Sequence, residues 1–309
     1  MYNWILYNNL IHVIGMSELV VILKIELYKC NNNFSFMIEL NKIYNENCLD
    51  TMKNIDDNCI DLTISSPPYD SLRVYKGYSF PFEEIAKELY RITKPGGVII
   101  WVVGDAVVDG GETGSSFRQA LFFQSIGFTI HDTMIYEKNG TAFPARRDGN
   151  RYSQIFEYMF VFSKGKPKTA NLICDKPNRW AGHTNWGNGS HYDVDGNKIV
   201  TGKNKPTPDF SPRNNIWKYN TGKGFSTKDK ISHPAIFPEK LAEDHVLTWS
   251  NEGDIIYDPM AGSGTTLKMA KLNNRQYIGS EISAEYCEEI KKRLDNTKTI
   301  NETLIINNQ

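Results

Sequence analysis

The chain alternates between short apolar runs and stretches in which apolar residues recur at helical spacing. Ile85, Leu89 and Ile92 fall on one helical face, because their spacing of three and four residues matches the helical turn. Pro81, just ahead of this stretch, suits a helix start, where a missing N–H is harmless. Helices are predicted over residues 82–93, 117–126, 241–249 and 265–272. Strands are predicted over residues 38–48, 60–65, 98–103, 128–136, 155–162, 254–257 and 276–282.

Strands that alternate with helices predict an α/β fold, a Rossmann-like, doubly wound and mainly parallel sheet. The alternation stops at Ser163 and resumes at His233. Between them glycine, proline, asparagine and lysine dominate, with little periodicity. We therefore expect one α/β domain with an inserted, loop-rich region, and 309 residues are enough to bury a core of that size.

The composition is that of an ordinary soluble globular protein, with 40% hydrophobic and 23% charged residues. Its five cysteines are scattered and form no C-x-x-C pair, which argues against a disulfide framework and against a zinc site. A reducing, intracellular setting fits this pattern. Near the N-terminus, Glu18, Lys24 and Glu26 interrupt the apolar stretches, so neither a membrane span nor a secretory signal is expected.

Charge is unevenly distributed along the chain, which carries −1 overall. Residues 164–230 contain 13 basic and 5 acidic side chains, a net charge of +8, so the rest of the chain carries −9. A basic insert within an acidic body is typical of a surface that binds a polyanion. On charge alone, a solvated lysine-rich loop explains the pattern equally well.

A glycine-rich segment follows the predicted strand at residues 254–257 and opens a predicted helix. Glycines let the backbone approach a ligand closely, and a helix N-terminus offers N–H groups to it. Glu281 ends the next predicted strand, about twenty residues beyond the glycines, which suits the two hydroxyls of a ribose. Taken alone, the glycines are explained equally well by a tight strand–helix connection. The segment consists of Asp258, Pro259, Met260, Ala261, Gly262, Ser263, Gly264, Thr265 and Thr266.

A second segment, Ser65-Ser66-Pro67-Pro68-Tyr69, ends the strand predicted at residues 60–65. The prolines fix φ and remove two N–H donors, which leaves a stiff loop rich in carbonyl acceptors. Such a loop suits a substrate amine, with the Ser66 hydroxyl as a further acceptor and Tyr69 as a face for a planar base. By itself, the segment is more often a plain proline turn.

Together the two segments resemble the DNA amino-methyltransferases, whose cofactor motif is D-P-x-x-G-S-G-T-T and whose catalytic motif is [DNS]-P-P-[YFW]. Residues 233–238, 89–97 and 156–164 resemble further family segments, and the resemblance runs from about residue 38 to residue 294. The catalytic motif precedes the cofactor motif with the basic region between them, which resembles the circularly permuted beta class. The resemblance implies S-adenosylmethionine as cofactor and double-stranded DNA as partner.

The resemblance also assigns roles to individual residues. Ser66, Pro67, Pro68 and Tyr69 are the expected catalytic residues. In this family an acidic residue near the first strand usually contacts the cofactor's adenine, and here Asn47 and Cys48 match that position. Asp50 is the other candidate for this contact, although it could instead simply cap a helix. The remaining expected cofactor-binding residues are Ser65, His233, Phe237, Pro238, the segment from Asp258 to Thr266, and Glu281.

Within this family, a serine at the position of Ser66 accompanies N4-cytosine methylation more often than N6-adenine methylation. We therefore expect N4-cytosine, with N6-adenine as the main alternative. A remoter alternative is an inactive DNA-binding protein that keeps the fold, and the order of the motifs argues against RNA or protein as substrate. Carbon-5 cytosine methyltransferases form a covalent intermediate through the cysteine of a Pro-Cys pair. None of the 13 prolines here precedes a cysteine, so that chemistry is excluded.

These assignments divide the chain. We expect an N-terminal extension (1–36), a catalytic half (37–163), a target-recognition region (164–230), a cofactor-binding half (231–294) and a C-terminal tail (295–309). The protein is expected in the cytoplasm, away from membranes, and a separately acting cognate restriction endonuclease is left open. Trp186 or Trp217 could fill the space left by a flipped base. Candidate phosphate contacts are Lys198, Lys203, Lys205, Arg213, Lys218, Lys223, Lys228 and Lys230, with Arg146, Arg147 and Arg151.

Overall fold

A computed structural model describes residues 38–68, 80–140, 151–184, 190–200, 205–220, 226–227, 229 and 236–299. Tyr69, His233 and the predicted N-terminal extension lie outside these described residues. Within the described part, no helix is both long and apolar enough to cross a bilayer. Nor do the described histidine, cysteine and acidic side chains form a cluster that could hold a metal ion.

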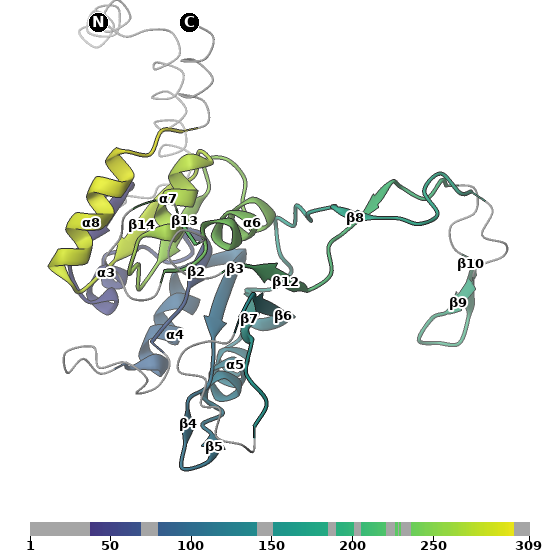
Figure 1. Cartoon of the computed structure of the whole chain (residues 1–309), viewed down its shortest axis with the longest axis horizontal. Coiled ribbons are helices and arrows are strands. Elements are labelled where there is room, and N and C mark those ends of the chain that lie inside the picture. Colours follow the sequence, from purple (N-terminus) through teal and green to yellow (C-terminus); the bar gives the residue numbers. More distant parts are fainter. Residues whose placement is uncertain are drawn as a thin grey trace, which may run out of the picture.

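The centre of the protein is an eight-stranded sheet (Figure 1). Only β7 runs against its neighbours, and the other described pairings in this sheet are parallel, which confirms the predicted, mainly parallel sheet. The strands lie in the order β1 (Lys42–Tyr44), β14 (Gln276–Ser280), β13 (Ile255–Asp258), β2 (Ile60–Ser65), β3 (Thr93–Val103), β7 (Phe156–Ser163), β6 (Thr129–Lys138) and β12 (Ile216–Tyr219).

Helices cover both faces of the sheet, so two hydrophobic cores form. α3 (Cys48–Lys53), α4 (Phe82–Ile92) and α5 (Ser115–Ser125) pack on one face. α6 (Glu239–Trp249), α7 (Thr265–Leu272) and α8 (Ala284–Asp295) pack on the other. Successive residues of β3 divide between the two cores: Val98 faces α6–α8 and Ile99 faces α3–α5, as the period of two in a strand requires.

The direction of winding reverses between β2 and β13, which are parallel neighbours. From β2 the chain crosses through α4 to β3, on one side. From β13 it crosses through α7, on the opposite face, to β14, on the other side. In open α/β sheets, ligands bind in the crevice at the carboxyl ends of the strands where the order reverses.

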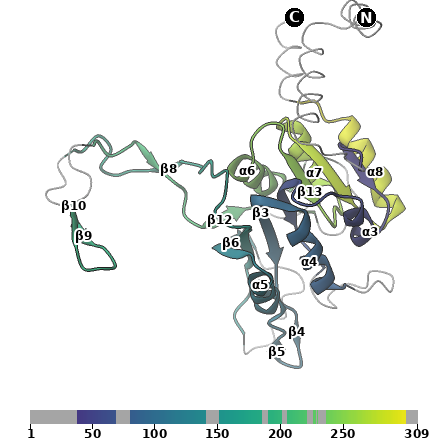
Figure 2. The same ribbon diagram turned by 180° about the vertical axis from the view of Figure 1, so that it is seen from behind.

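An extended arm, defined here by the described residues between Cys174 and Asn214, projects from the body in both Figure 1 and Figure 2. It carries two short antiparallel ladders, β8 (Lys176–Pro177) with β11 (Phe210–Ser211), and β9 (Ser190–Tyr192) with β10 (Lys198–Val200). After the arm, β12 returns to the sheet beside β6. The arm lies within the predicted recognition region 164–230, whose bounds stay a prediction.

Two helices of the body were not predicted from the sequence. The strand expected over residues 38–48 is only β1, because Asn47 caps α3: its Oδ1 accepts from the N–H of Leu49 at 3.0 Å. α8 follows the cap residue Ser283, and its apolar face is thin among many charged residues. The other predicted elements occur with bounds shifted by a few residues, and β3 begins at Thr93, five residues before the predicted start of that strand. A further small hairpin joins β4 (Val107–Val108) and β5 (Gly111–Glu112).

Candidate active site

The two chemical motifs meet at one edge of the sheet. Ser65 ends β2 and Asp258 ends β13, and these parallel neighbours bring their carboxyl ends together. The Thr266 hydroxyl, in the first turn of α7, lies 3.5 Å from the carbonyl oxygen of Ile64. The proline loop and the glycine-rich loop are therefore adjacent, at the point where the strand order reverses.

The glycine-rich loop needs glycine at two positions for steric reasons. Gly262 and Gly264 have φ of 53° and 72°, in the left-handed region that side chains rarely adopt. A Cβ on Gly264 would also lie 2.9 Å from side-chain carbons of Ile290 in α8. Backbone hydrogen bonds hold the loop: the N–H of Ala261 donates to the carbonyl oxygen of Ser280, at the end of β14, at 2.9 Å, and the N–H of Gly264 donates to the carbonyl oxygen of Ala261 at 2.7 Å. The loop therefore turns tightly from β13 into α7.

Glu281 lies directly against this loop. Its Oε2 accepts from the N–H of Gly262 at 2.9 Å, and its Oε1 accepts from the N–H of Ser283 at 2.9 Å. Burial raises the pKa of the Glu281 carboxyl, while these backbone donors act in the opposite direction. The carboxylate is thus fixed beside the glycines and keeps acceptor capacity for hydroxyl groups of a ligand.

Asp258 is almost fully buried, with 4% of its surface exposed. Burial raises the pKa of its carboxyl to about 7, although the N–H of Met260, 3.1 Å from Oδ1, favours the charged form. The Ser65 hydroxyl is near enough to favour that form as well, but within the described residues it makes no hydrogen bond of good geometry. Pro259 is also buried, so this part of the motif shapes the loop from within the fold.

The corner between β1 and α3 joins the same site. The Asn45 side-chain amide donates to the carbonyl oxygens of Glu281 and Ile282 at 2.9 and 3.0 Å, which ties the corner to the end of β14. Asn47, expected to contact an adenine, uses Oδ1 to cap α3, and one of that oxygen's lone pairs remains available. Cys48 is buried, and burial raises the pKa of its thiol to about 12.

Asp50, the alternative to Asn47, is not the helix cap. It lies in the first turn of α3 and forms an exposed ion pair with Lys53 at 2.7 Å. The structure therefore gives the capping role to Asn47.

The proline loop is described as far as Pro68. Ser66 and Pro68 are half-buried and Pro67 is buried, so Ser66 is partly accessible at the carboxyl end of β2. Because Pro67 and Pro68 have no N–H, the loop offers acceptors more readily than donors. An arrangement of this kind can bind an amine that donates hydrogen bonds.

Phe237 and Pro238 directly precede α6, and the start of this helix is joined to the glycine-rich loop by a charged network that sequence reasoning missed. Phe237 packs against the core on the α6–α8 face, and Pro238 is the N-cap residue of α6. The next residue, Glu239, accepts from Arg293 of α8 at 2.6 Å and from Lys268 of α7 at 2.7 Å. The start of α6 is thereby joined to both α7 and α8.

Arg293 is the centre of this network and is only 7% exposed. Its guanidinium donates to the carbonyl oxygen of Ser263 at 2.6 Å and to the hydroxyl of Thr265 at 3.0 Å, both in the glycine-rich loop. It also donates to Asp229 at 2.7 Å, and Lys268 donates to the same carboxylate at 2.7 Å. Arg293 therefore holds the glycine-rich loop in place. Its neighbours in the sequence are mostly charged, so the sequence alone does not distinguish it from a surface arginine.

The base of the arm is held by a second arginine. Arg213 donates to Asp244 of α6 at 2.8 Å and to Asp175, where the arm leaves the body, at 2.9 Å through Nε. Asp244 is 2% exposed and also accepts from the Tyr219 hydroxyl at 2.7 Å. Arg213 thus has an internal role in place of the expected phosphate contact.

One further expectation for DNA recognition is revised, and two stay predictions. Lys218 pairs with Glu137 at 2.6 Å and Arg151 pairs with Glu112 at 3.7 Å, but both basic residues are exposed at the surface. Trp217 is 6% exposed and stacks on His245 with ring centres 4.7 Å apart, so it is a core residue and cannot replace a flipped base. Lys198 and Lys205 are exposed on the arm. The other expected contacts, Trp186, Lys203, Lys223, Lys228, Lys230, Arg146 and Arg147, lie outside the described residues.

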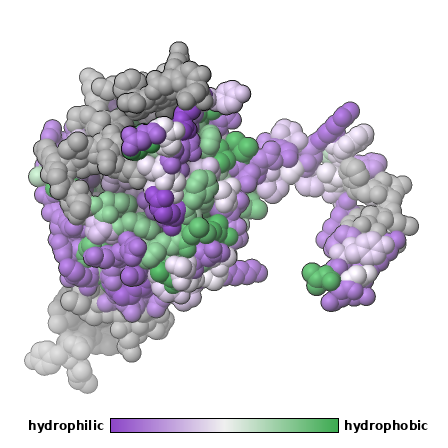
Figure 3. Space-filling model, turned by 90° about the horizontal axis from the view of Figure 1, so that it is seen from below, coloured by the Kyte–Doolittle hydropathy of each residue, from purple (hydrophilic) through white to green (hydrophobic). Residues whose placement is uncertain are grey.

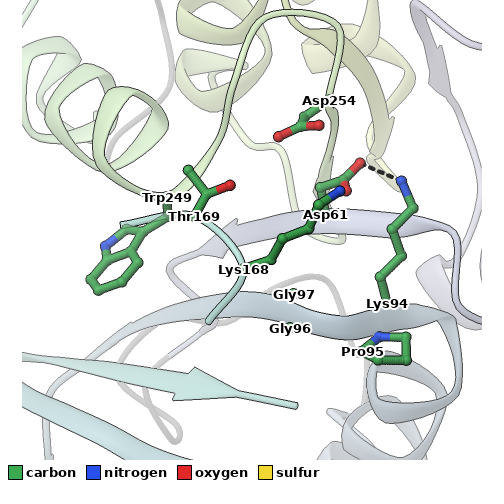
Figure 4. Close-up of a pocket in the computed structure, with 9 residues that line it drawn as sticks. All are labelled: Asp61, Lys94, Pro95, Gly96, Gly97, Lys168, Thr169, Trp249 and Asp254. Carbon is green, nitrogen blue, oxygen red and sulfur yellow. Dashed lines mark hydrogen bonds and ion pairs between the residues drawn. The ribbon is translucent and has the colours of Figure 1, made fainter. Parts of the chain in front are cut away.

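A small charged pocket lies at the opposite, amino edge of the sheet (Figure 4). Asp61 of β2 accepts from Lys94 of β3 at 2.6 Å and from the N–H of Ile255 at 3.0 Å. Asp61, Lys94 and Ile255 all lie near the amino-terminal ends of parallel strands. The pocket and the two chemical loops are therefore at opposite edges of the sheet. These bonds tie three strands together, which is a structural role.

Asp258 gives a testable pH dependence. In the folded chain its carboxyl keeps its proton up to about pH 7, whereas its ordinary pKa is 3.8. The folded state therefore binds more protons between about pH 4 and pH 7, and this group lowers the free energy of unfolding as pH rises through that window. Asp258→Asn removes the titration and can still accept from Met260.

We expect the free energy of unfolding of the Asp258→Asn variant, relative to wild type, to increase from pH 4 to pH 7 by about 4 kcal/mol at most. Urea titrations at a series of pH values measure this difference, and other titrating groups cancel because both proteins contain them. A difference that stays constant across the window would show that Asp258 ionises normally.

Comparison with known sequences agrees with the geometry. The family N6_N4_Mtase, described as DNA methylase, matches residues 60–292. Orphan methyltransferase M.BamHII of Bacillus amyloliquefaciens is 60% identical over 246 residues, which cover 79% of this chain and 92% of that protein. Type II methyltransferase M.BglII of Bacillus subtilis is 28% identical over 263 residues, covering 81% and 67% of the two chains.

Solved structures share the fold. PvuII DNA methyltransferase (cytosine-N4-specific) matches with a TM-score of 0.62 at 18% identity, over 86% of this chain and 91% of that one. The M1.HpyAVI–SAM complex matches with a TM-score of 0.53 at 24% identity, over 82% and 99%. These likenesses confirm the expected Rossmann-like fold. With a family match that spans most of the sheet and a relative at 60% identity, the chain belongs to the N6_N4 family of DNA methylases.

Proposed function

We propose that this DNA methyltransferase transfers a methyl group from S-adenosylmethionine to the N4 amine of cytosine in double-stranded DNA. One observation carries the proposal: the Ser66 loop and the glycine-rich loop with Glu281 lie at adjacent strand ends. An acceptor-rich loop for an amine thus stands beside a loop suited to a nucleoside. Proximity of this kind supplies much of the rate of a group transfer.

The residues of the glycine-rich loop fit S-adenosylmethionine chemically. The Glu281 carboxylate can accept from both ribose hydroxyls, and the loop at Gly262 and Gly264 has no side chains to obstruct a close approach. The name of the M1.HpyAVI–SAM complex supports the same cofactor. When bound, the cofactor supplies an electrophilic methyl group on a sulfonium.

The Ser66 loop prepares that nitrogen. The lone pair of an exocyclic amine is delocalised into the ring, which makes it a poor nucleophile. Hydrogen bonds from its two N–H groups to the Ser66 hydroxyl and the Pro67 carbonyl draw the lone pair out of conjugation. Tyr69 is proposed to stack on the base once it has left the duplex. The nitrogen gains the methyl group and releases one of its two protons to solvent, and no covalent bond to the protein is needed.

N4-cytosine is favoured over N6-adenine by Ser66 itself, since serine at this position accompanies cytosine more often. The PvuII methyltransferase is named cytosine-N4-specific, but its 18% identity supports the fold and not the substrate. N6-adenine remains the second candidate, because both bases present an amine beside a ring nitrogen and the family name covers both. A folded, inactive binding protein is disfavoured, since binding alone does not require the fixed Glu281 and the Ser66 loop.

The cellular setting is part of the proposal. The relatives named here come from bacteria, and a DNA substrate is met in the cytoplasm of such cells. The names of the relatives differ on a partner endonuclease, because M.BamHII is called an orphan and M.BglII a Type II methyltransferase. A separately acting endonuclease therefore stays a prediction.

Incubation with methyl-labelled S-adenosylmethionine and duplex DNA tests the proposal. Because Ser66 favours a cytosine amine, we expect the label in N4-methylcytosine after digestion to nucleosides. Label in N6-methyladenine would overturn the choice of base while keeping the family activity. Label that enters RNA or protein alone would overturn the DNA substrate.

Ser66→Ala tests the catalytic loop. Removing one preorganised group from the site of charge development typically costs about hundredfold in turnover, so we expect a loss of that order. Cofactor binding, measured by calorimetry, is expected to stay unchanged because the Glu281 site is intact. Ser125→Ala is the matched control, since that hydroxyl only donates to Phe122 in α5. Wild-type turnover in the Ser66 variant would remove Ser66 from the mechanism.

Arg293→Ala tests the clamp on the glycine-rich loop. The change removes the hydrogen bonds that Arg293 donates to the Ser263 carbonyl and to Asp229. We therefore expect about tenfold weaker cofactor binding and a less stable protein. Calorimetry and urea titration measure the two effects. Lys292→Ala removes a neighbouring exposed charge and should leave both unchanged.

Arg293→Lys separates geometry from charge. A lysine keeps the positive charge beside Asp229 and Glu239 but lacks the planar fork that reaches the loop. We expect it to recover most of the stability while cofactor binding stays weak. Equal recovery of both would show that the loop does not depend on the guanidinium.

A further inference from the structure

We propose that the turn formed by residues 178–183 of the arm is a contact surface for double-stranded DNA, with Trp180 packing its indole against the duplex and Arg179 contacting a phosphate. The inference rests on the proposed function, because it takes DNA as the substrate. Net charge alone did not show whether residues 164–230 bind a polyanion or form a solvated loop. The inference assigns the DNA contact to one turn within that region.

Trp180 differs from the other tryptophans that the structure describes. Trp101, Trp217 and Trp249 are 0%, 6% and 6% exposed, whereas Trp180 is 55% exposed. An indole has a large apolar face, and burying it on association is favourable. Trp180 therefore presents to solvent the kind of side chain that stacks on bases or packs against deoxyribose.

The turn that presents Trp180 is held by hydrogen bonds. The N–H of Asn178 donates to Asp209 at 2.8 Å, and Gly182 donates to Thr207 at 2.9 Å. Thr207 in turn donates to His183 at 2.9 Å, which closes a ladder across the two strands of the arm. Because the turn is already ordered, less conformational entropy is lost when it binds a partner.

The surroundings of the indole favour a polyanion. The Arg179 guanidinium lies 5.4 Å from the centre of the Trp180 ring. Lys176 and Lys205, which precede and follow the turn in the chain, are exposed, and Asp209 is the acidic residue in the ladder. A cation beside an aromatic face is the combination that binds phosphate and base together.

The chemistry of the arm argues against an apolar protein partner. Figure 3 shows a mainly hydrophilic arm, in contrast with the apolar patches on the visible face of the body. Stable interfaces between protein chains bury a broad apolar centre. Around the turn, the described exposed side chains are mainly polar, with Phe210 as a further exposed apolar residue in addition to Trp180. A duplex needs no such area, since phosphate contacts dominate its affinity. DNA is therefore the occupant that the turn fits.

Trp180→Ala and Trp180→Phe test the indole. The probe is a mixed-sequence duplex of about 30 base pairs, roughly three helical turns. We expect Trp180→Ala to bind it about tenfold more weakly with an unchanged salt dependence, and Trp180→Phe to keep most of the affinity. Quenching of tryptophan fluorescence by the duplex should be reduced in Trp180→Phe. Leu121→Ala, which shortens a 61% exposed side chain on α5, is the matched control.

Arg179→Ala tests the phosphate contact. Since each neutralised phosphate releases counterions, the slope of log K against log salt should fall by about 0.9 in magnitude. Lys292→Ala removes the same charge from the body, on α8, and should leave the slope unchanged. A slope that falls equally in both variants would reflect net charge alone and would overturn the contact.

The outcomes separate this inference from the proposed function. Wild-type protein that methylates DNA, together with Trp180→Ala and Arg179→Ala variants that bind the duplex as wild type does, would overturn the inference alone. Wild-type protein that neither binds nor methylates DNA would overturn both. If Trp180→Ala instead changed the mass of the free protein in sedimentation, the turn would be an interface between copies of this chain.

Discussion

β2 and β13 pair as parallel neighbours although the chain between them builds most of the protein, including the arm. Asp61 at the start of β2 accepts from the N–H of Ile255, 194 residues further along. This single pairing determines where both chemical loops lie, because each loop leaves the sheet at the same edge and on either side of the reversal. The buried Asp258 and the fixed Glu281 acquire their environments from it. Without the pairing of β2 with β13, the Ser66 loop and the glycine-rich loop would not lie side by side.

The sheet and the two loops could be predicted from the sequence because their signals are local. The strand runs, the glycines at 262 and 264 and the double proline each have a meaning within a window of ten residues. The order of these segments added the family resemblance. α8 escaped prediction because its apolar positions, such as Ile290, are few among charged ones. The early strand was predicted too long because a capping asparagine reads, in sequence, like any other polar residue.

The missed site residues are those whose roles depend on distant partners. Arg293 bonds to Asp229, Glu239 and the loop at Ser263, which lie 30 to 64 residues away. Arg213 similarly joins Asp175 to Asp244. A basic residue has the same appearance in sequence whether it pairs inside the fold or faces solvent. For the same reason, charge counting assigned a phosphate contact to Arg213, which pairs inside the fold.

α6 is the element that both arginines share. Arg293 holds its first residue, Glu239, and Arg213 holds Asp244, five residues further along the same helix. A helix of 11 residues is about 16 Å long and stiff along its axis. The glycine-rich loop and the base of the arm are therefore both connected to one rigid helix. If binding at one of these two places shifted the helix, it would change the binding free energy at the other, and thermodynamic linkage makes that effect reciprocal. A shift of α6 on binding either ligand would therefore change the affinities for cofactor and DNA by the same factor.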